Sequence, residues 1–155
     1  SDPVTEGVQA ISATSGAFAA LKVDGSVIVW GSSETEANTS DVASELEEGV
    51  QTVRSTQMTF AALKSSGSVI VWGDAHGVPS SDVAKQLTEG VQEIFWNYNA
   101  FAALKVGGSV VAWGKPYSPY HVGGDASSVA GQLKDGVRSI VNTNLAFAAL
   151  KVNGY

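Results

Sequence analysis

The chain of 155 residues has no cysteine and few charged side chains. Without cysteine it forms no disulfide and offers no thiolate nucleophile or cysteine metal site. Charged residues make up 15% of the sequence, against about 25% in an average protein, and the net charge is −6. Broad binding of nucleic acid or anionic lipid requires clustered lysine and arginine, so neither partner is expected.

Long hydrophobic runs are missing as well. The longest, such as residues 69–72, are far short of the ~20 residues that cross a bilayer, and no cleavable signal segment is visible. We therefore expect a soluble chain with no direct membrane insertion. Its first residue is Ser1 rather than Met, which is typical of a processed or trimmed chain, such as an organellar one.

What the sequence has instead is repetition. The segment Phe-Ala-Ala-Leu-Lys occurs four times, beginning at Phe18, Phe60, Phe101 and Phe147. A period of about 42 residues indicates supersecondary units that bury their apolar faces only by stacking on one another. We divide the chain, as one array, into approximate units 7–48, 49–89 and 90–135 and a partial unit 136–155.

Each unit has the same predicted parts. Phe-Ala-Ala-Leu-Lys and Ser-Val-x-x-Trp-Gly form the strands of a hairpin, joined by a two-residue turn such as Asp24-Gly25. The second strand is apolar on both faces, which predicts cover on both sides. The alanine pair is small, which suggests that units approach closely there. The lysine before each turn is expected to reach water.

Two further segments complete a unit. A short Gly-Val strand precedes the hairpin, with paired apolar positions such as Val8 and Ile11. Residues 40–49, 81–90 and 127–136 begin with serine, carry Val and Leu four apart and end with glycine, which predicts a helix of about two turns. A short irregular strand is the alternative for these segments.

The predicted fold is therefore mainly β, built from tandem repeats of a hairpin, an extra strand and a short helix, in an arc or an open, partial β-propeller. The repeated aromatic side chains should be buried in equivalent places in every unit. These residues are Phe18, Phe60, Phe101 and Phe147, and Trp30, Trp72 and Trp113.

The order Asp-Gly-Ser-Val, Trp-Gly, a loop, Leu and Gly-Val, then Ala-Leu resembles the repeat of the regulator of chromosome condensation family, whose units build β-propellers. The resemblance covers the whole chain and is that of a divergent branch. Where the family has glycine and then histidine before Ala-Leu, this chain has Thr14, Thr56, Asn97 and Thr143, and then Ala17, Thr59, Ala100 and Ala146. The repeats also resemble, in sequence, those of long repeat arrays of unicellular algae and some bacteria.

The fourth unit stops at Tyr155, before the Trp-Gly strand that the other units carry. An unpaired hairpin strand is an edge that proteins normally cover. Either the natural chain continues, or another chain supplies the strand.

No constellation of residues predicts catalysis, a cofactor or a metal ion. His76 and His121 stand at different offsets in variable loops, as expected of solvated histidines. The acidic residues between Glu34 and Glu48 lack the spacing of a calcium loop, so they are expected on a solvated helix face and its surrounding loop. We therefore expect a protein that is not an enzyme.

The third unit differs most from the others. Phe95, Trp96 and Tyr98 replace small residues of the first unit, and the following loop is about five residues longer. That loop carries Tyr117, Tyr120 and His121, with Pro116 and Pro119. Aromatic residues on loops are typical of binding hot spots. The candidate partner-binding residues are therefore Trp96, Tyr98, Tyr117, Tyr120 and His121. The alternatives are that Phe95 and Trp96 fill a wider core, and that the loop covers the end of the array.

Three functional hypotheses remain. The first is a non-catalytic scaffold that binds protein as a structural or accessory subunit, or fragment, of a larger assembly; in an algal chain the host would be a photosynthetic or other membrane complex. The second, implied by the family resemblance alone, is a regulatory propeller that promotes guanine-nucleotide exchange on a small GTPase, although the residues of the family's exchange face have no match here. The third is a glycan-binding repeat, based on the aromatic loop.

Overall fold

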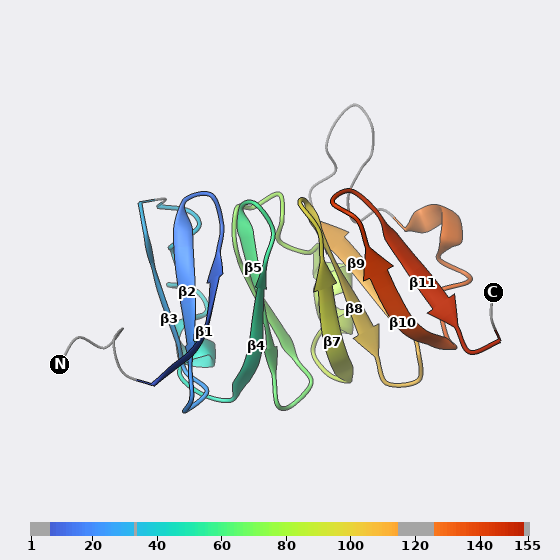
Figure 1. Cartoon of the computed structure of the whole chain (residues 1–155), viewed down its shortest axis with the longest axis horizontal. Helices are drawn as coiled ribbons and strands as arrows, with labels where there is room; N and C mark the ends of the chain where they lie inside the picture. The colour runs from blue at the N-terminus through green and yellow to red at the C-terminus, as the bar shows by residue number, and fades with distance from the viewer. Residues whose placement is uncertain (1–6, 33, 115–125, 154–155) are drawn as a thin grey trace.

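The computed structural model describes residues 7–32, 34–114 and 126–153, and these form four small antiparallel sheets side by side in chain order (Figure 1). The first three sheets have three strands each and the fourth has two. The strands of units 1 and 2 are β1 (Val8–Ala13), β2 (Ala17–Lys22), β3 (Val27–Gly31), β4 (Val50–Ser55), β5 (Thr59–Lys64) and β6 (Val69–Gly73). Those of units 3 and 4 are β7 (Val91–Trp96), β8 (Ala100–Lys105), β9 (Val110–Gly114), β10 (Val137–Asn142) and β11 (Phe147–Lys151). The prediction of a mainly β repeat array in an open arc is confirmed.

The hairpin register is the same in each complete unit. Phe18 pairs with Trp30, Phe60 with Trp72 and Phe101 with Trp113. In each pair the rings stack, with centroids 5.6, 5.1 and 5.2 Å apart. The repeat therefore places its two large aromatic side chains on one face of every complete sheet.

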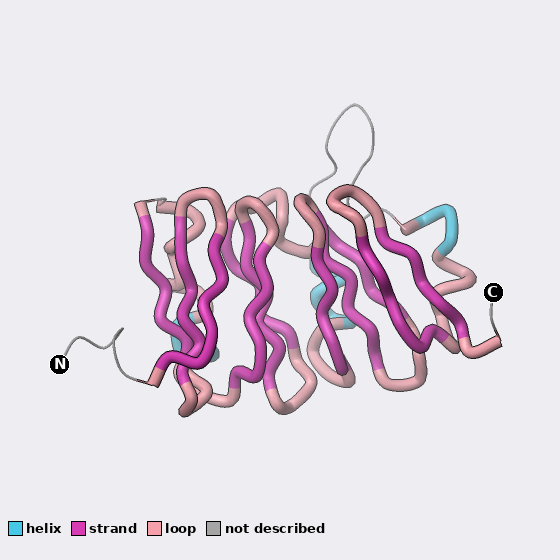
Figure 2. The backbone as a smooth tube through the Cα atoms, in the orientation of Figure 1, coloured by secondary structure: helices cyan, strands magenta, loops and turns pink. Residues whose placement is uncertain are grey.

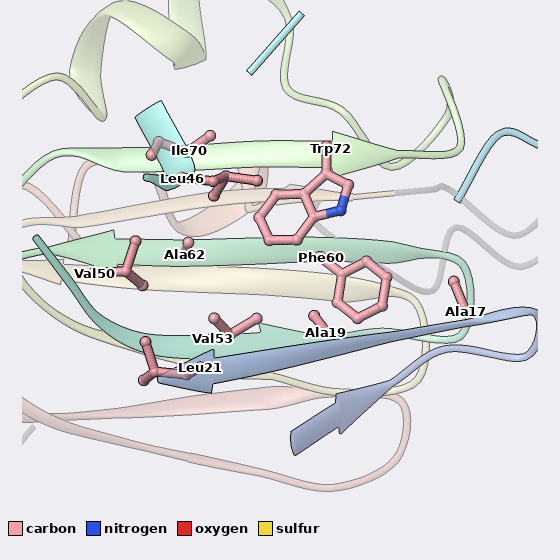
Figure 3. Close-up of a cluster of buried hydrophobic side chains, with 10 residues drawn as sticks. All are labelled: Ala17, Ala19, Leu21, Leu46, Val50, Val53, Phe60, Ala62, Ile70 and Trp72. Carbon is pink, nitrogen blue, oxygen red and sulfur yellow. The ribbon is translucent and has the colours of Figure 1, made fainter. Parts of the chain in front are cut away.

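The hydrophobic cores lie between units, because adjacent residues of a strand point to opposite faces. In the cluster between units 1 and 2, Phe60 and Trp72 lie on the unit 2 side, opposite Ala19 and Leu21 of β2 (Figure 3). The other face of the unit 2 sheet contributes Ala61 and Leu63 to the next cluster. Each middle sheet is thus covered on both sides, as the doubly apolar strands predicted. The alanine pairs of units 1 to 3 are at most 1% exposed, which confirms the close approach.

The prediction of equivalent burial is wrong for the first unit, and it fails in the fourth as well, where Phe147 is only partly buried. Phe60 and Phe101 are fully buried, and Trp72 and Trp113 are 4% and 3% exposed, but Phe18 is 46% exposed. Phe18 lies on the face that a preceding unit would cover. Burial of Phe18 and its equivalents therefore depends on the neighbouring unit, as expected for a repeat architecture.

The hairpin turn also differs from the prediction. The Gly25 amide donates to the Lys22 carbonyl, so Val23 and Asp24 are the central residues and Gly25 follows them with φ +82°. This is a three-residue loop that ends in a left-handed glycine, not a two-residue turn. The amide and hydroxyl of Ser26 donate to the Asp24 carboxylate, and these bonds lower the pKa of Asp24.

The predicted helices are present but short. Their segments form a 3-10 turn η1 (Ala43–Leu46), an α-helix α1 (Ser81–Gln86) and a 3-10 turn η2 (Ser127–Val129). Leu46 and Leu87, at or just after the helix end, are buried between adjacent sheets, which explains the regular leucine. The alternative of an irregular strand is wrong. Loops and turns gather along the two edges of the row of sheets (Figure 2).

The repeated lysines do not simply reach water. The Lys64 ammonium donates to the Glu45 carbonyl at 2.8 Å, and Lys105 and Lys151 donate in the same way to Gln86 and Gln132 at 2.6 and 3.0 Å. Each carbonyl lies in the last turn of the short helical segment of the preceding unit or just after it, where a cation is favoured. These lysines therefore bind one unit to the one before it.

Replacing Lys105 by Met should lower the free energy of unfolding by about 0.5–1.5 kcal/mol, the usual range for one hydrogen bond. The matched control is Lys85→Met, on the helix α1 that carries the Gln86 acceptor, since Lys85 has only an exposed ion pair with Asp82 and its replacement should cost less than about 0.5 kcal/mol. Urea unfolding of both variants measures the difference. Equal costs would show that the bond to Gln86 does not join the units.

Within the described ranges, no helix is both long and apolar enough to cross a bilayer.

Candidate functional site

A ladder of backbone hydrogen bonds joins the four units along one edge of the array. The Ser15 amide donates to the Gln57 carbonyl, the Gln57 amide to Tyr98, and the Tyr98 amide to Asn144, at 2.8, 3.0 and 3.1 Å. These residues occupy the same place in each unit, in the loop before the hairpin. We call this the upper edge, since these loops lie at the top of Figure 1. The ladder fixes each loop to the next one.

Trp96 and Tyr98 bring the only aromatic side chains that these equivalent positions carry in any unit. Trp96 ends β7 and is 39% exposed, and Tyr98 is 51% exposed. The Arg54 guanidinium of unit 2 lies over the Trp96 ring, 4.6 Å from its centroid. This cation–π contact holds the indole at the junction of units 2 and 3.

Asn97, between the two aromatic residues, is 6% exposed. Its Oδ1 accepts hydrogen bonds from the amides of Asn99 and Ala100, at 3.0 and 2.9 Å. Thr14 and Thr143 accept from the amide three residues later in the same way, which explains the recurrent Thr or Asn. Asn97 differs in that its Nδ2 is buried without any acceptor among the described atoms.

These residues line a groove of about 370 Å³ across units 2, 3 and 4. The residues lining it are Ser55, Thr56, Gln57, Trp96, Asn97, Tyr98, Asn142, Thr143 and Asn144. Its lining is rich in amides and hydroxyls, with two aromatic side chains and no ionisable group other than the Tyr98 phenol. The Arg54 Nε, beside Trp96, is a second buried donor without a partner in the described structure. The groove thus suits a ligand with hydrogen-bond acceptors and an apolar group.

Of the five residues predicted to bind a partner, the structure brings Trp96 and Tyr98 together in this groove. Tyr117, Tyr120 and His121 lie outside the described residues. Gly114, the last residue described before them, pairs with Ala100 at the upper edge. Phe95 packs partly against the cluster between units 3 and 4, so the alternative of core filling applies to Phe95. Sequence comparison of the units did not indicate Asn97 or Arg54, because neither is aromatic.

The acidic residues do not all lie on a solvated face as predicted. Glu36 is 4% exposed and accepts hydrogen bonds from the Thr14 hydroxyl and from the Gly16 amide at 3.0 Å. Its counterpart in unit 2 is Gly77, where a Cβ atom would lie only 1.9 Å from the hydroxyl oxygen of Thr59. Glu36 therefore anchors its loop at a place that Thr59 fills in the next unit.

No cluster of three or more His, Cys, Asp or Glu side chains that could hold a metal ion occurs in the ranges 7–32, 34–114 and 126–153. His76 is exposed in its loop and donates only its backbone amide, to Asp74. Among the described residues, the upper edge thus offers groups suited to recognition.

No protein-family model matches the sequence, and no curated protein is significantly similar to it. Solved structures are similar in fold. One is Prp20p from Saccharomyces cerevisiae, with a TM-score of 0.61 and 16% identity over 95% of this chain and 43% of that one. Another is the CRINKLY WD40 ectodomain of the Arabidopsis thaliana receptor kinase ACR4, with a TM-score of 0.57 and 17% identity over 97% of this chain and 49% of that one. Human WBSCR16 aligns with a TM-score of 0.52 and 22% identity over 83% of this chain and 37% of its own.

These neighbours establish a β-propeller-type repeat fold at low sequence identity. The chain spans less than half the length of each of the three. The similarity in fold does not by itself assign an activity to this chain.

Proposed function

We propose that the chain is a non-catalytic repeat scaffold that binds a segment of a partner protein in the upper-edge groove. The observation that carries this proposal is the groove itself, where Trp96 and Tyr98 stand exposed around the buried, unpartnered Nδ2 of Asn97. An exposed aromatic pair supplies the apolar contact typical of hot spots. A buried donor without an acceptor gains a partner when a peptide carbonyl enters.

The groove is suited to a preformed contact. The ladder through Gln57, Tyr98 and Asn144 fixes its floor, and Arg54 holds the Trp96 ring. Ordering of the site therefore costs little free energy on binding. Tyr117, three residues after Gly114 in the sequence, is part of the proposed contact.

The partner segment should be extended and should carry an apolar or aromatic side chain. Its backbone carbonyls would accept from Asn97 Nδ2, and its side chain would pack on Trp96 and Tyr98. The amides of Gln57, Asn142 and Asn144 provide further main-chain recognition. The role as accessory subunit of a larger assembly, such as a photosynthetic complex, is part of this proposal.

The test is selection of peptides from a displayed random library, followed by titration of one selected peptide against variants. Trp96→Ser and Asn97→Ala should each weaken binding, the first by about 2 kcal/mol or roughly 30-fold in Kd. Val106→Ser is the control, because Val106 is also apolar and 67% exposed but lies at a hairpin turn away from the groove. Circular dichroism confirms that the variants fold. Unchanged Kd in both groove variants would contradict the proposal.

The family resemblance supports a second hypothesis, that the chain is a divergent regulator acting on a small GTPase. Yeast RCC1 (Prp20) is a fold neighbour, with a TM-score of 0.59 and 17% identity. A nucleotide-release assay across a panel of small GTPases separates the two readings. Acceleration by the chain would support exchange activity, and its absence together with peptide binding would support the scaffold. Glycan binding abolished by Trp96→Ser would instead favour the lectin reading.

A further inference from the structure

The two ends of the array expose opposite halves of one repeated interface. In each internal junction, one unit contributes a leading face with its Phe and its Ile or Val, and the unit before it contributes a trailing face with its Ala and Leu; in the first two junctions the leading face also carries a Trp. The leading face of unit 1 consists of Ile11, Phe18, Ile28 and Trp30. The trailing face of unit 4, whose described sheet has two strands and lacks the third-strand valines of the earlier units, includes Val141, Ala148 and Leu150.

Exposure shows how much each end differs from its internal equivalents. Ile11 is 59% exposed, whereas Val53, Ile94 and Ile140 at the same place in later units are 6%, 2% and 4% exposed. Leu150 is 42% exposed, whereas its equivalents in earlier units are at most 6% exposed. These earlier equivalents are Leu21, Leu63 and Leu104. The side chains at the ends are those that the array buries wherever the other half is present.

The polar groups of the two ends are complementary too. In the upper-edge ladder each unit donates an amide to the carbonyl of the next one. The Asn144 amide at one end and the Ser15 carbonyl at the other are thus the donor and the acceptor that one further step of the ladder would join. An apolar face and a ladder bond would be satisfied together by the same contact.

From these observations we propose that the trailing face of one chain docks on the leading face of a second copy. Such a contact is heterologous, so it either closes into a ring or extends into a filament. This chain covers 49% of the ACR4 ectodomain chain while aligning over 97% of its own length, so two copies have about the length of that one propeller chain. Of the two arrangements, the proposal is the closed one, a ring of two copies joined by two identical junctions.

The test is the molar mass of the 155-residue chain by size-exclusion chromatography with light scattering. The wild type should have twice the 16.0 kDa mass of one chain. Ile11→Asp places a charge on the leading face, and Leu150→Asp places one on the trailing face. Each variant alone should therefore be monomeric. Mixed in equal amounts, they should form dimers again, because each retains the half that the other lacks. Val106→Asp, an exposed position on neither face, is the control and should stay dimeric.

Several outcomes would overturn the proposal. A monomeric wild type would show that the ends do not pair. Dimers of Leu150→Asp alone, with monomers of Ile11→Asp, would show that two leading faces pair with each other. Failure of the two folded variants to combine would exclude a junction between unlike faces. Far-ultraviolet circular dichroism and thermal unfolding show that each variant keeps the fold, and neither substitution touches the groove of Trp96.

Discussion

Phe60→Ala should cost about 3–5 kcal/mol of unfolding free energy, the usual range for truncating a core aromatic residue. Phe60 is fully buried between units 1 and 2, where it stacks on Trp72 and packs against Ala19 and Leu21 of the preceding unit (Figure 3). The substitution removes both contacts and leaves a cavity that backbone hydrogen bonds on either side keep from collapsing. Urea unfolding measures the loss.

Phe18→Ala is the matched control, since the residue, the strand position and the stacked tryptophan are the same. Phe18 is 46% exposed, so the monomer should lose only about 1 kcal/mol. Both measurements should use the Leu150→Asp background, which places a charge on the trailing face and so prevents the proposed junction. Equal costs would contradict stabilisation by neighbouring units.

The sequence predicted the parts of the fold that depend on side-chain pattern. Spacing of Phe-Ala-Ala-Leu-Lys and Trp-Gly predicted the hairpins and the sharing of each sheet between two cores, because alternation along a strand decides which face a residue occupies. The exposure of Phe18 could have been inferred as well, because it lies on the face that each later unit packs against the unit before it. The prediction treated all repeats as equivalent and missed this.

The contacts between units could not be read from side chains. The upper-edge ladder uses backbone atoms of Ser15, Gln57, Tyr98 and Asn144, four different residue types, so no motif marks it. The lysines did carry a signal, their recurrence before every turn. Their acceptor, however, is a backbone carbonyl 19 residues earlier, which only the packing of successive units reveals.

In the candidate site, too, some features could be predicted from the sequence and others depend on packing. Trp96 and Tyr98 were found because they replace small residues of another unit. Asn97 stands where two other units have a similarly bonded Thr, so its role in the loop is visible from the repeat. Its orphaned Nδ2 depends on how tightly the neighbouring loops close over it, which is a property of packing alone.

The second large effect on the free energy of unfolding is expected at a turn glycine. Gly67→Ala should cost about 2–5 kcal/mol, as the sum of left-handed backbone strain and a forced clash. Gly67 has φ +84°, and a Cβ atom there would lie 2.9 Å from the Gly90 nitrogen of the next unit. The Gly67 carbonyl also accepts from the Val91 amide at 2.9 Å, so the chain cannot move away without losing that bond.

Gly107→Ala is the control that separates strain from contact. Gly107 also has a left-handed backbone, with φ +89°, but a Cβ atom there would meet nothing within 4 Å. Unit 2 has Ser66 at the same place, so this turn accepts a side chain, and the cost should be about 1 kcal/mol. Chemical denaturation of the two variants under identical conditions gives the comparison. A similar loss in both would show that left-handed strain alone selects the glycine, whereas an excess of at least about 1 kcal/mol at Gly67 would show that the close approach of the next unit requires it.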